Sequence, residues 1–187
     1  GIPVYNPFED PFETNAYGRI FSGCCGHPQL NGVYHYHKYP TCLRLIKDQW
    51  KSEKDKCDVV DALLVPDGHS PLLGFAVDGW PIYGPVGWRD SNSQTGVLLK
   101  SSFTGANDSA DNPSYVAGTG DLDECNGLVS PTPEFPEGIY HYVMTVESGE
   151  DGKVLRYVNP HFGYDVRNTL NKHGVMPASW ATDEDYL

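Results

Sequence analysis

The segment Gly32–Pro40, with the sequence GVYHYHKYP, places two histidines two residues apart among tyrosines. Side chains alternate between the two faces of an extended strand. We therefore expect His35 and His37 to share one face, and the tyrosines beside them to share the other. Neutral imidazole is a common metal ligand, so two imidazoles side by side indicate a metal site.

A second segment of the same kind, Gly138–Val143, has the sequence GIYHYV and one histidine, His141. If the two Tyr/His strands are neighbours, His141 joins His35 and His37 in a three-imidazole site. Three protein ligands and one open position for water are typical of catalytic zinc sites. The expected cofactor is therefore a divalent transition metal, zinc, copper or iron. The alternative is that these histidines form hydrogen bonds in a packed sheet and bind no metal.

Four more residues are candidate ligands of the same site: Asp78, Glu124, His27 and His69. A carboxylate from Asp78 or Glu124 would shift the preference toward iron or manganese, or would orient a ligand. His27 and His69 lie in turn-like segments, where a histidine bonded to the backbone is the commoner case. The acidic residues also fit the caps of turns.

The composition favours strands and loops over helices. The 187 residues include 20 glycines and 15 prolines, and 12% of them are aromatic. We predict a mainly β fold, a single domain of antiparallel sheet or sheets with long disulfide-tied loops and one or two short helices. The helices are expected near residues 42–50 and 58–64.

The domain organisation follows from shifts in composition along the chain. Residues 1–19 are rich in proline and aromatic residues, and we expect an extended arm there; residues 20–187 form the β domain. A surface insertion is expected at about 89–120, where Ser, Asn, Gly and Asp dominate. We also predict a strand at 72–77 with a turn at 78–79. A further strand at 154–158 is expected to form a hairpin with 140–146.

The net charge of −12 repels phosphate backbones and anionic lipids, so no nucleic-acid partner is expected. No apolar run reaches the roughly 18 residues of a membrane helix. We therefore expect a soluble protein without a membrane span. The chain starts without Met or an apolar leader, as a processed product or a trimmed chain would.

Five cysteines lie near Gly, Pro and Asn, which favours disulfides in an oxidising compartment. Their connectivity is open, because five cysteines leave one over. The sequence Asn107-Asp108-Ser109 fits a glycosylation site at Asn107. A secreted, extracellular or cell-surface location is therefore expected. The disulfide candidates are Cys24, Cys25, Cys42, Cys57 and Cys125.

Three segments together resemble the YHYH domain family, named after its Tyr-His-Tyr-His motif. They are residues 24–42 with CCGHP and GVYHYH, residues 70–85 with GFAVDGWPIYGP, and residues 122–142 with LDECNG and GIYHY. The resemblance covers about half of the chain and implies an exported domain, but no settled activity. Family members tend to place a cysteine after an aromatic-Pro-aromatic-Phe stretch, whereas this chain has Asn159–Gly163, NPHFG, without one.

Two functions of different classes follow. The first is an exported metal-binding domain with a three-histidine site, whose metal-bound water could serve a hydrolytic or hydration enzyme. The second is a structural or adhesive extracellular module that contacts other copies of itself or glycan. Converging histidines favour the first function; the odd cysteine and the aromatic arm favour the second. A Ser-His-Asp hydrolase is disfavoured, because Ser70 lacks the Gly-x-Ser-x-Gly context of such enzymes.

Overall fold

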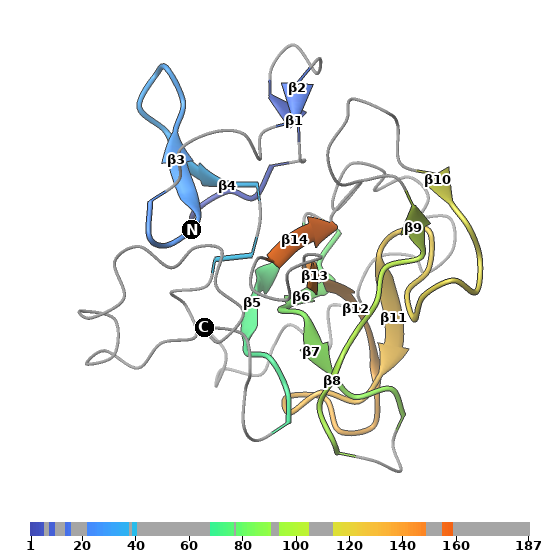
Figure 1. The fold of residues 1–187 in the computed structure, drawn as a ribbon. Helices are drawn as coiled ribbons and strands as arrows, with labels where there is room; N and C mark the ends of the chain where they lie inside the picture. Colours follow the sequence, from blue (N-terminus) through green and yellow to red (C-terminus); the bar gives the residue numbers. More distant parts are fainter. Residues whose placement is uncertain are drawn as a thin grey trace.

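The computed structural model describes residues 1–5, 8–9, 14–15, 22–37, 39–40, 68–76, 78–90, 94–104, 114–148 and 155–158. All regular elements within these residues are β-strands, as the predicted mainly β class requires (Figure 1). The helices expected near 42–50 and 58–64 lie outside the described residues.

A four-stranded sheet forms the centre of the described structure (Figure 1). Its strands, in spatial order, are β11 (Gly127–Ser130), β12 (Ile139–Val143), β6 (Pro81–Tyr83) and β5 (Leu72–Phe75). The outer pairs are antiparallel, as predicted, but β12 runs parallel to β6. The sheet is therefore mixed. The long connection between β6 and β12 permits this pairing, because parallel neighbours need a crossover.

The hairpin of β5 and β6 confirms the predicted strand and turn. The strand ends at Phe75, and the turn closes where the Gly79 amide donates to the Ala76 carbonyl at 2.9 Å. Gly79 has a φ of 88°, a conformation that costs glycine little and other residues more. The turn therefore needs the Asp-Gly sequence that predicted it.

The central sheet is covered on both faces. Along β12, alternation places Tyr140 and Tyr142 on one face, where they pack in an aromatic core with Trp80 and Tyr39. Val143 points to the other face, where it packs with Leu99 and Leu122. Both faces of β12 are thus buried, which explains its continuously apolar and aromatic sequence.

Besides this sheet, the described residues form five two-stranded ladders. The predicted hairpin at 154–158 is present, but its partner strand begins at Thr145, which pairs with Val158. The ladders are β1–β2 (Phe8–Glu9, Thr14–Asn15), β3–β4 (Gly26–Pro28, Tyr34–Tyr36), β7–β8 (Val86–Gly87, Val97–Leu98), β9–β10 (Phe103–Thr104, Ser114–Tyr115) and β13–β14 (Thr145–Ser148, Leu155–Val158).

The first residues of the chain attach the β3–β4 hairpin to the core. Val4 forms a parallel bridge with Tyr36, and the Tyr5 amide donates to the Tyr36 carbonyl at 2.7 Å. Val4 also packs against the aromatic core, and Tyr39, just beyond β4, is buried within it. The described start of the expected arm is therefore extended and lies on the domain.

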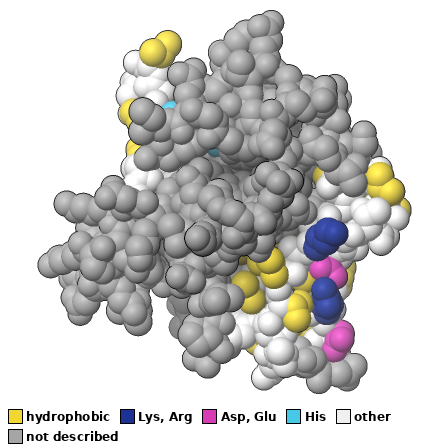
Figure 2. All heavy atoms as spheres, in the orientation of Figure 1, with side chains coloured by type: hydrophobic (Ala, Val, Ile, Leu, Met, Phe, Trp, Pro, Cys, Tyr) yellow, Lys and Arg dark blue, Asp and Glu magenta, His cyan; other side chains and the backbone are white. Residues whose placement is uncertain are grey.

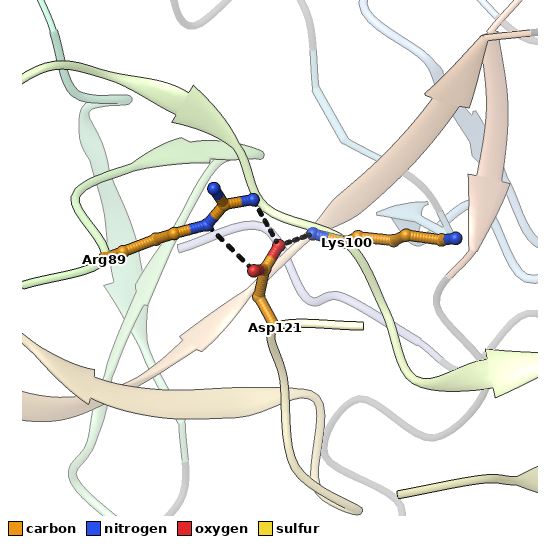
Figure 3. A network of polar contacts seen from close by, with 3 residues as sticks. All are labelled: Arg89, Lys100 and Asp121. Atoms are coloured by element: carbon orange, nitrogen blue, oxygen red, sulfur yellow. Dashed lines mark hydrogen bonds and ion pairs between the residues drawn. The ribbon is translucent and has the colours of Figure 1, made fainter. Parts of the chain in front are cut away.

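The expected surface insertion at 89–120 contains buried residues. Leu99 is fully buried, and Ser101 and Ser102 are buried beside it in the chain. An ion pair also ties this region down, because the Arg89 guanidinium donates to the Asp121 carboxylate at 2.9 Å (Figure 3). The Lys100 amide donates to the same carboxylate at 2.8 Å, while its side chain points away. Leu99 and residues 101–103 are thus buried in this region, whereas most of its other described residues are exposed.

Candidate metal centre

Three histidines gather on the β3–β4 hairpin: His27, His35 and His37. Each offers one ligand nitrogen, and these nitrogens all lie within 4.8 Å of one another. The Nε2 atoms of His35 and His37 are 2.9 Å apart. The predicted pairing of His35 with His37 on one face is therefore confirmed, and His27 completes the group.

The strand pattern accounts for this grouping. His27 pairs directly with His35 across the antiparallel ladder, and paired residues point to the same face. His37 lies two residues beyond His35 and so also shares that face. The Asn-Gly sequence turns the chain between the strands, with Gly32 at a φ of 85° and its amide donating to the Gln29 carbonyl. The tyrosines of β4 take the opposite side, where Tyr34 and Tyr36 form an edge-on pair.

A hydrogen bond to a backbone carbonyl orients the His35 ring, as is usual for metal-binding histidines. Its Nδ1 lies 3.2 Å from the Val33 carbonyl, so this nitrogen carries the proton and Nε2 keeps a lone pair toward His37. The Tyr5 ring stacks on His35 with ring centroids 4.5 Å apart. His35 and His37 are each only 2% exposed, and Figure 2 shows small traces of histidine on the face drawn. His35 and His37 are thus shielded from bulk water, whereas His27 is half-buried.

The spacing of the nitrogens fits a metal. Nitrogens bound tetrahedrally to one zinc ion at 2.0–2.1 Å lie roughly 3.3 Å apart. In this group the His35 and His37 Nε2 atoms are 2.9 Å apart, and one nitrogen from each of the three rings lies within 4.8 Å of the others. The 2.9 Å distance between His35 and His37 also fits a hydrogen bond between two neutral imidazoles. Among the described residues the donor set is three nitrogens without a carboxylate, which suits zinc or copper.

The structure places His141 away from this group. The β4 strand pairs with β3, whereas β12 lies between β11 and β6, so the two Tyr/His strands are not neighbours. His141 instead packs with His69 and Tyr83, at ring-centroid distances of 6.2 and 5.1 Å. The sequence-based grouping of His141 with His35 is corrected accordingly: His27 takes its place, and His69 belongs with His141.

The candidate carboxylates also lie elsewhere. Asp78 accepts hydrogen bonds from the Tyr142 hydroxyl at 2.6 Å and from the Trp80 amide at 3.3 Å. Asp78 and Glu124 are both described, and neither belongs to the histidine group. The turn before β11 is capped by Asp123, whose carboxylate accepts from the amides of Cys125 and Gly127 at 2.9 and 3.0 Å. Turn capping by the acidic residues is thus observed at Asp78 and Asp123.

Burial is the main influence on the pKa values of His69 and His141, the two histidines that pack against each other. The pKa of His141 is lowered to about 4, mainly by burial of the ring; the hydrogen bond to the Ile139 carbonyl opposes this shift, and the neighbouring His69 adds to it. Burial also lowers the pKa of His69, against the hydrogen bond to the Ser70 carbonyl and the charge of Glu134. Both rings are therefore neutral near pH 7.

The sequence did not identify two residues that support the structure around the site and the central sheet. Tyr5 covers His35, and Asn126 is fully buried at a φ of 59°. Asn126 could have been found, because Asn is the non-glycine residue best suited to a left-handed turn, and here an Asn-Gly pair opens a strand. Nothing in the sequence marks Tyr5 as the ring that stacks on a histidine.

The cysteines fall into two groups. Cys24 and Cys25, in the turn before β3, are disulfide-bonded, whereas Cys125 is a buried thiol. No disulfide joins two described residues, and Cys42 and Cys57 lie outside the described part. The connectivity, and the tying of loops by disulfides, therefore stay predictions. Asn107 also lies outside the described residues.

No helix among the described residues has the length and apolar character that crossing a membrane would require. Neither the curated proteins nor the solved structures contain a match to this chain.

Fold and site together define a mainly β domain with histidines gathered on a Tyr/His hairpin. The family model described as YHYH protein matches residues 9–150. This match spans well over half of the sequence, so the chain belongs to the YHYH family. The resemblance drawn from the three motif segments is thereby confirmed.

Proposed function

We propose that this chain is an exported metal-binding domain whose centre is formed by His27, His35 and His37. The observation that carries the proposal is the approach of three imidazole nitrogens to within 4.8 Å of one another. The ring tautomer of His35 supports it, because the backbone already holds the proton on Nδ1. The expected metal is zinc or copper, because no carboxylate of the described residues joins the three nitrogens.

A three-histidine centre leaves one coordination position for water. A metal bound there would lower the pKa of that water toward neutrality and supply a nucleophile for hydrolysis or hydration. The chain itself would hold the ligands on two hydrogen-bonded strands and restrict water with the Tyr5 ring. If the domain is an enzyme, His37→Ala should abolish activity while the fold persists.

The second candidate function is a structural or adhesive extracellular module. It is favoured by exposed apolar residues beside the histidines: Leu30 is fully exposed and Val33 is 43% exposed at the hairpin tip. In this function, the 2.9 Å contact between His35 and His37 is a hydrogen bond between neutral rings. Contacts with other copies or with glycan would then use this tip.

Metal content separates the two functions. The protein is purified without chelator or metal-affinity resin and analysed for zinc, copper and iron. We expect the His35→Ala/His37→Ala variant to hold about one equivalent of metal less than the wild type, because two of three ligands are gone. Tyr34→Phe is the matched control: it changes the opposite face of the same strand and should keep the metal.

Circular dichroism of all three proteins checks that the hairpin variants fold. Equal metal in the wild type and the double variant would contradict the proposal. So would the lack of any metal in the wild type, even after incubation with zinc and copper salts. Either result would leave the structural module as the better account of the histidines.

A further inference from the structure

A second pair of histidines lies in the central sheet, apart from the β3–β4 hairpin. His69 precedes β5 and His141 belongs to β12, and their ring centroids are 6.2 Å apart. Both rings meet the Tyr83 ring edge-on, at 5.0 and 5.1 Å. His69 is 8% exposed and His141 is fully buried. The pair is therefore inside the domain.

The two imidazoles are held in the same way. His69 Nδ1 lies 2.7 Å from the Ser70 carbonyl, and His141 Nδ1 lies 3.1 Å from the Ile139 carbonyl. A carbonyl only accepts, so the proton of each neutral ring is on Nδ1 and the lone pair is on Nε2. Metal-binding histidines are typically fixed by such a bond.

Within the described part of the chain, neither lone pair has a hydrogen-bond partner. Among the described residues, no group donates a hydrogen bond to Nε2 of His69 or of His141, and both atoms are buried. A buried polar atom without a hydrogen bond costs about 1–3 kcal/mol. Two such atoms of the same chemical type, in rings that face a common neighbour, indicate that something absent from the protein chain satisfies them.

We propose that His69 and His141 bind one Cu(I) ion through their Nε2 atoms. Two imidazoles that bind one ion through nitrogens about 2 Å from it have ring centres about 6 Å apart when the nitrogens lie on opposite sides of the ion. The observed separation of 6.2 Å matches this nearly linear arrangement. Cu(I) accepts two ligands in line, whereas zinc requires four.

The charge of the surroundings also selects a monovalent ion. The nearby Tyr83 hydroxyl donates to Glu134 at 2.8 Å and lies 3.0 Å from the Thr132 hydroxyl, so the acidic group is already engaged. The other neighbour, Trp88, is uncharged and packs edge-on against His69 at 5.1 Å. Burying a dication between two neutral ligands would cost far more than burying a monovalent ion.

The competing occupant is a water molecule that donates to both nitrogens, as buried waters commonly do. The experiment uses the His35→Ala/His37→Ala variant, which lacks the hairpin centre, so its result does not depend on the function proposed above. The protein is titrated without oxygen with Cu(I) against a chromogenic Cu(I) chelator. We expect about one Cu(I) per chain, and no comparable uptake of zinc.

A third substitution tests the ligands. Adding His69→Gln should weaken Cu(I) binding by about 100-fold or more, because one of two ligands is lost. Adding Ser130→Ala is the matched control. Ser130 Oγ is also buried and makes no hydrogen bond with a described residue, but it is no ligand, so affinity should not change. Near-ultraviolet circular dichroism checks the fold of each variant.

X-ray absorption of the Cu(I) complex gives a readout that needs no substitution in the buried pair. The expected spectrum is that of two-coordinate Cu(I) with nitrogen neighbours. A shell of sulfur would assign the copper to cysteine or methionine instead and overturn the proposal. It would also be overturned by the absence of uptake, which leaves water only, by equal uptake of zinc, or by an affinity that His69→Gln leaves unchanged.

Discussion

Replacing Asn126 with alanine is expected to lower the free energy of unfolding by about 4 kcal/mol, a large part of the stability of a typical domain. The Asn126 amide donates to the Val143 carbonyl at 2.7 Å and to the Thr145 hydroxyl at 3.2 Å. Its own carbonyl oxygen accepts from the Ser101 hydroxyl at 2.7 Å. Alanine would remove these hydrogen bonds from buried groups, and it would also have to adopt a positive φ.

Urea unfolding followed by tryptophan fluorescence measures this loss. Asn126→Gly separates its two causes, because glycine tolerates the positive φ but cannot make the hydrogen bonds. We expect the glycine variant to be about 1 kcal/mol more stable than the alanine variant. Ser101→Ala, which removes one bond of the same network, should cost about 1–2 kcal/mol. A loss below about 1 kcal/mol for Asn126→Ala would show that the network contributes little.

Acidification is expected to destabilise the protein through the buried pair His69 and His141. The pKa of His141 is about 4 in the folded protein, against 6.5 in an exposed histidine. Between these values the unfolded chain binds a proton that the folded protein excludes. The contribution of His141 is therefore complete above pH 6.5 and is lost as the pH falls toward 4. The difference amounts to about 3 kcal/mol.

The measurement is urea unfolding at several pH values between about 7 and 4. His141→Gln removes the titrating ring, so the variant should lose stability less steeply over this range than the wild type. The lowered pKa of His69 acts in the same direction. Other groups that titrate there are common to both proteins and cancel in the comparison. Parallel pH profiles would contradict the burial of a neutral His141.

The sequence predicted which side chains share a strand face better than it predicted which strands lie next to each other. Strand alternation correctly placed His35 with His37, because that relation depends only on a local period of two residues. The choice of His141 as the third ligand depended on which strands pair, and strand order is a long-range property of the sheet. His27 was within reach of local reasoning, since the Asn-Gly turn makes it the cross-strand partner of His35.

Burial was harder to predict in polar segments. Residues 89–120 have the composition of a surface loop, yet Leu99 lies fully buried and packs with Val143. A single leucine between short polar stretches gives no periodic signal. The parallel pairing of β12 with β6 was likewise not predicted, because both strands are buried on both sides and their patterns do not distinguish parallel from antiparallel partners.

Because His27 pairs with His35 across the hairpin, the length of the loop 29–33 decides whether the three histidines lie on one face. Loops usually tolerate insertions and deletions, because they change little beyond their own conformation. Here, shifting one strand past the other by one residue would turn its side chains to the opposite face. His27 would then point toward the tyrosine side, and the group of three would break up. Variation in this loop should therefore occur through substitutions, or through insertions that preserve the register of the two strands.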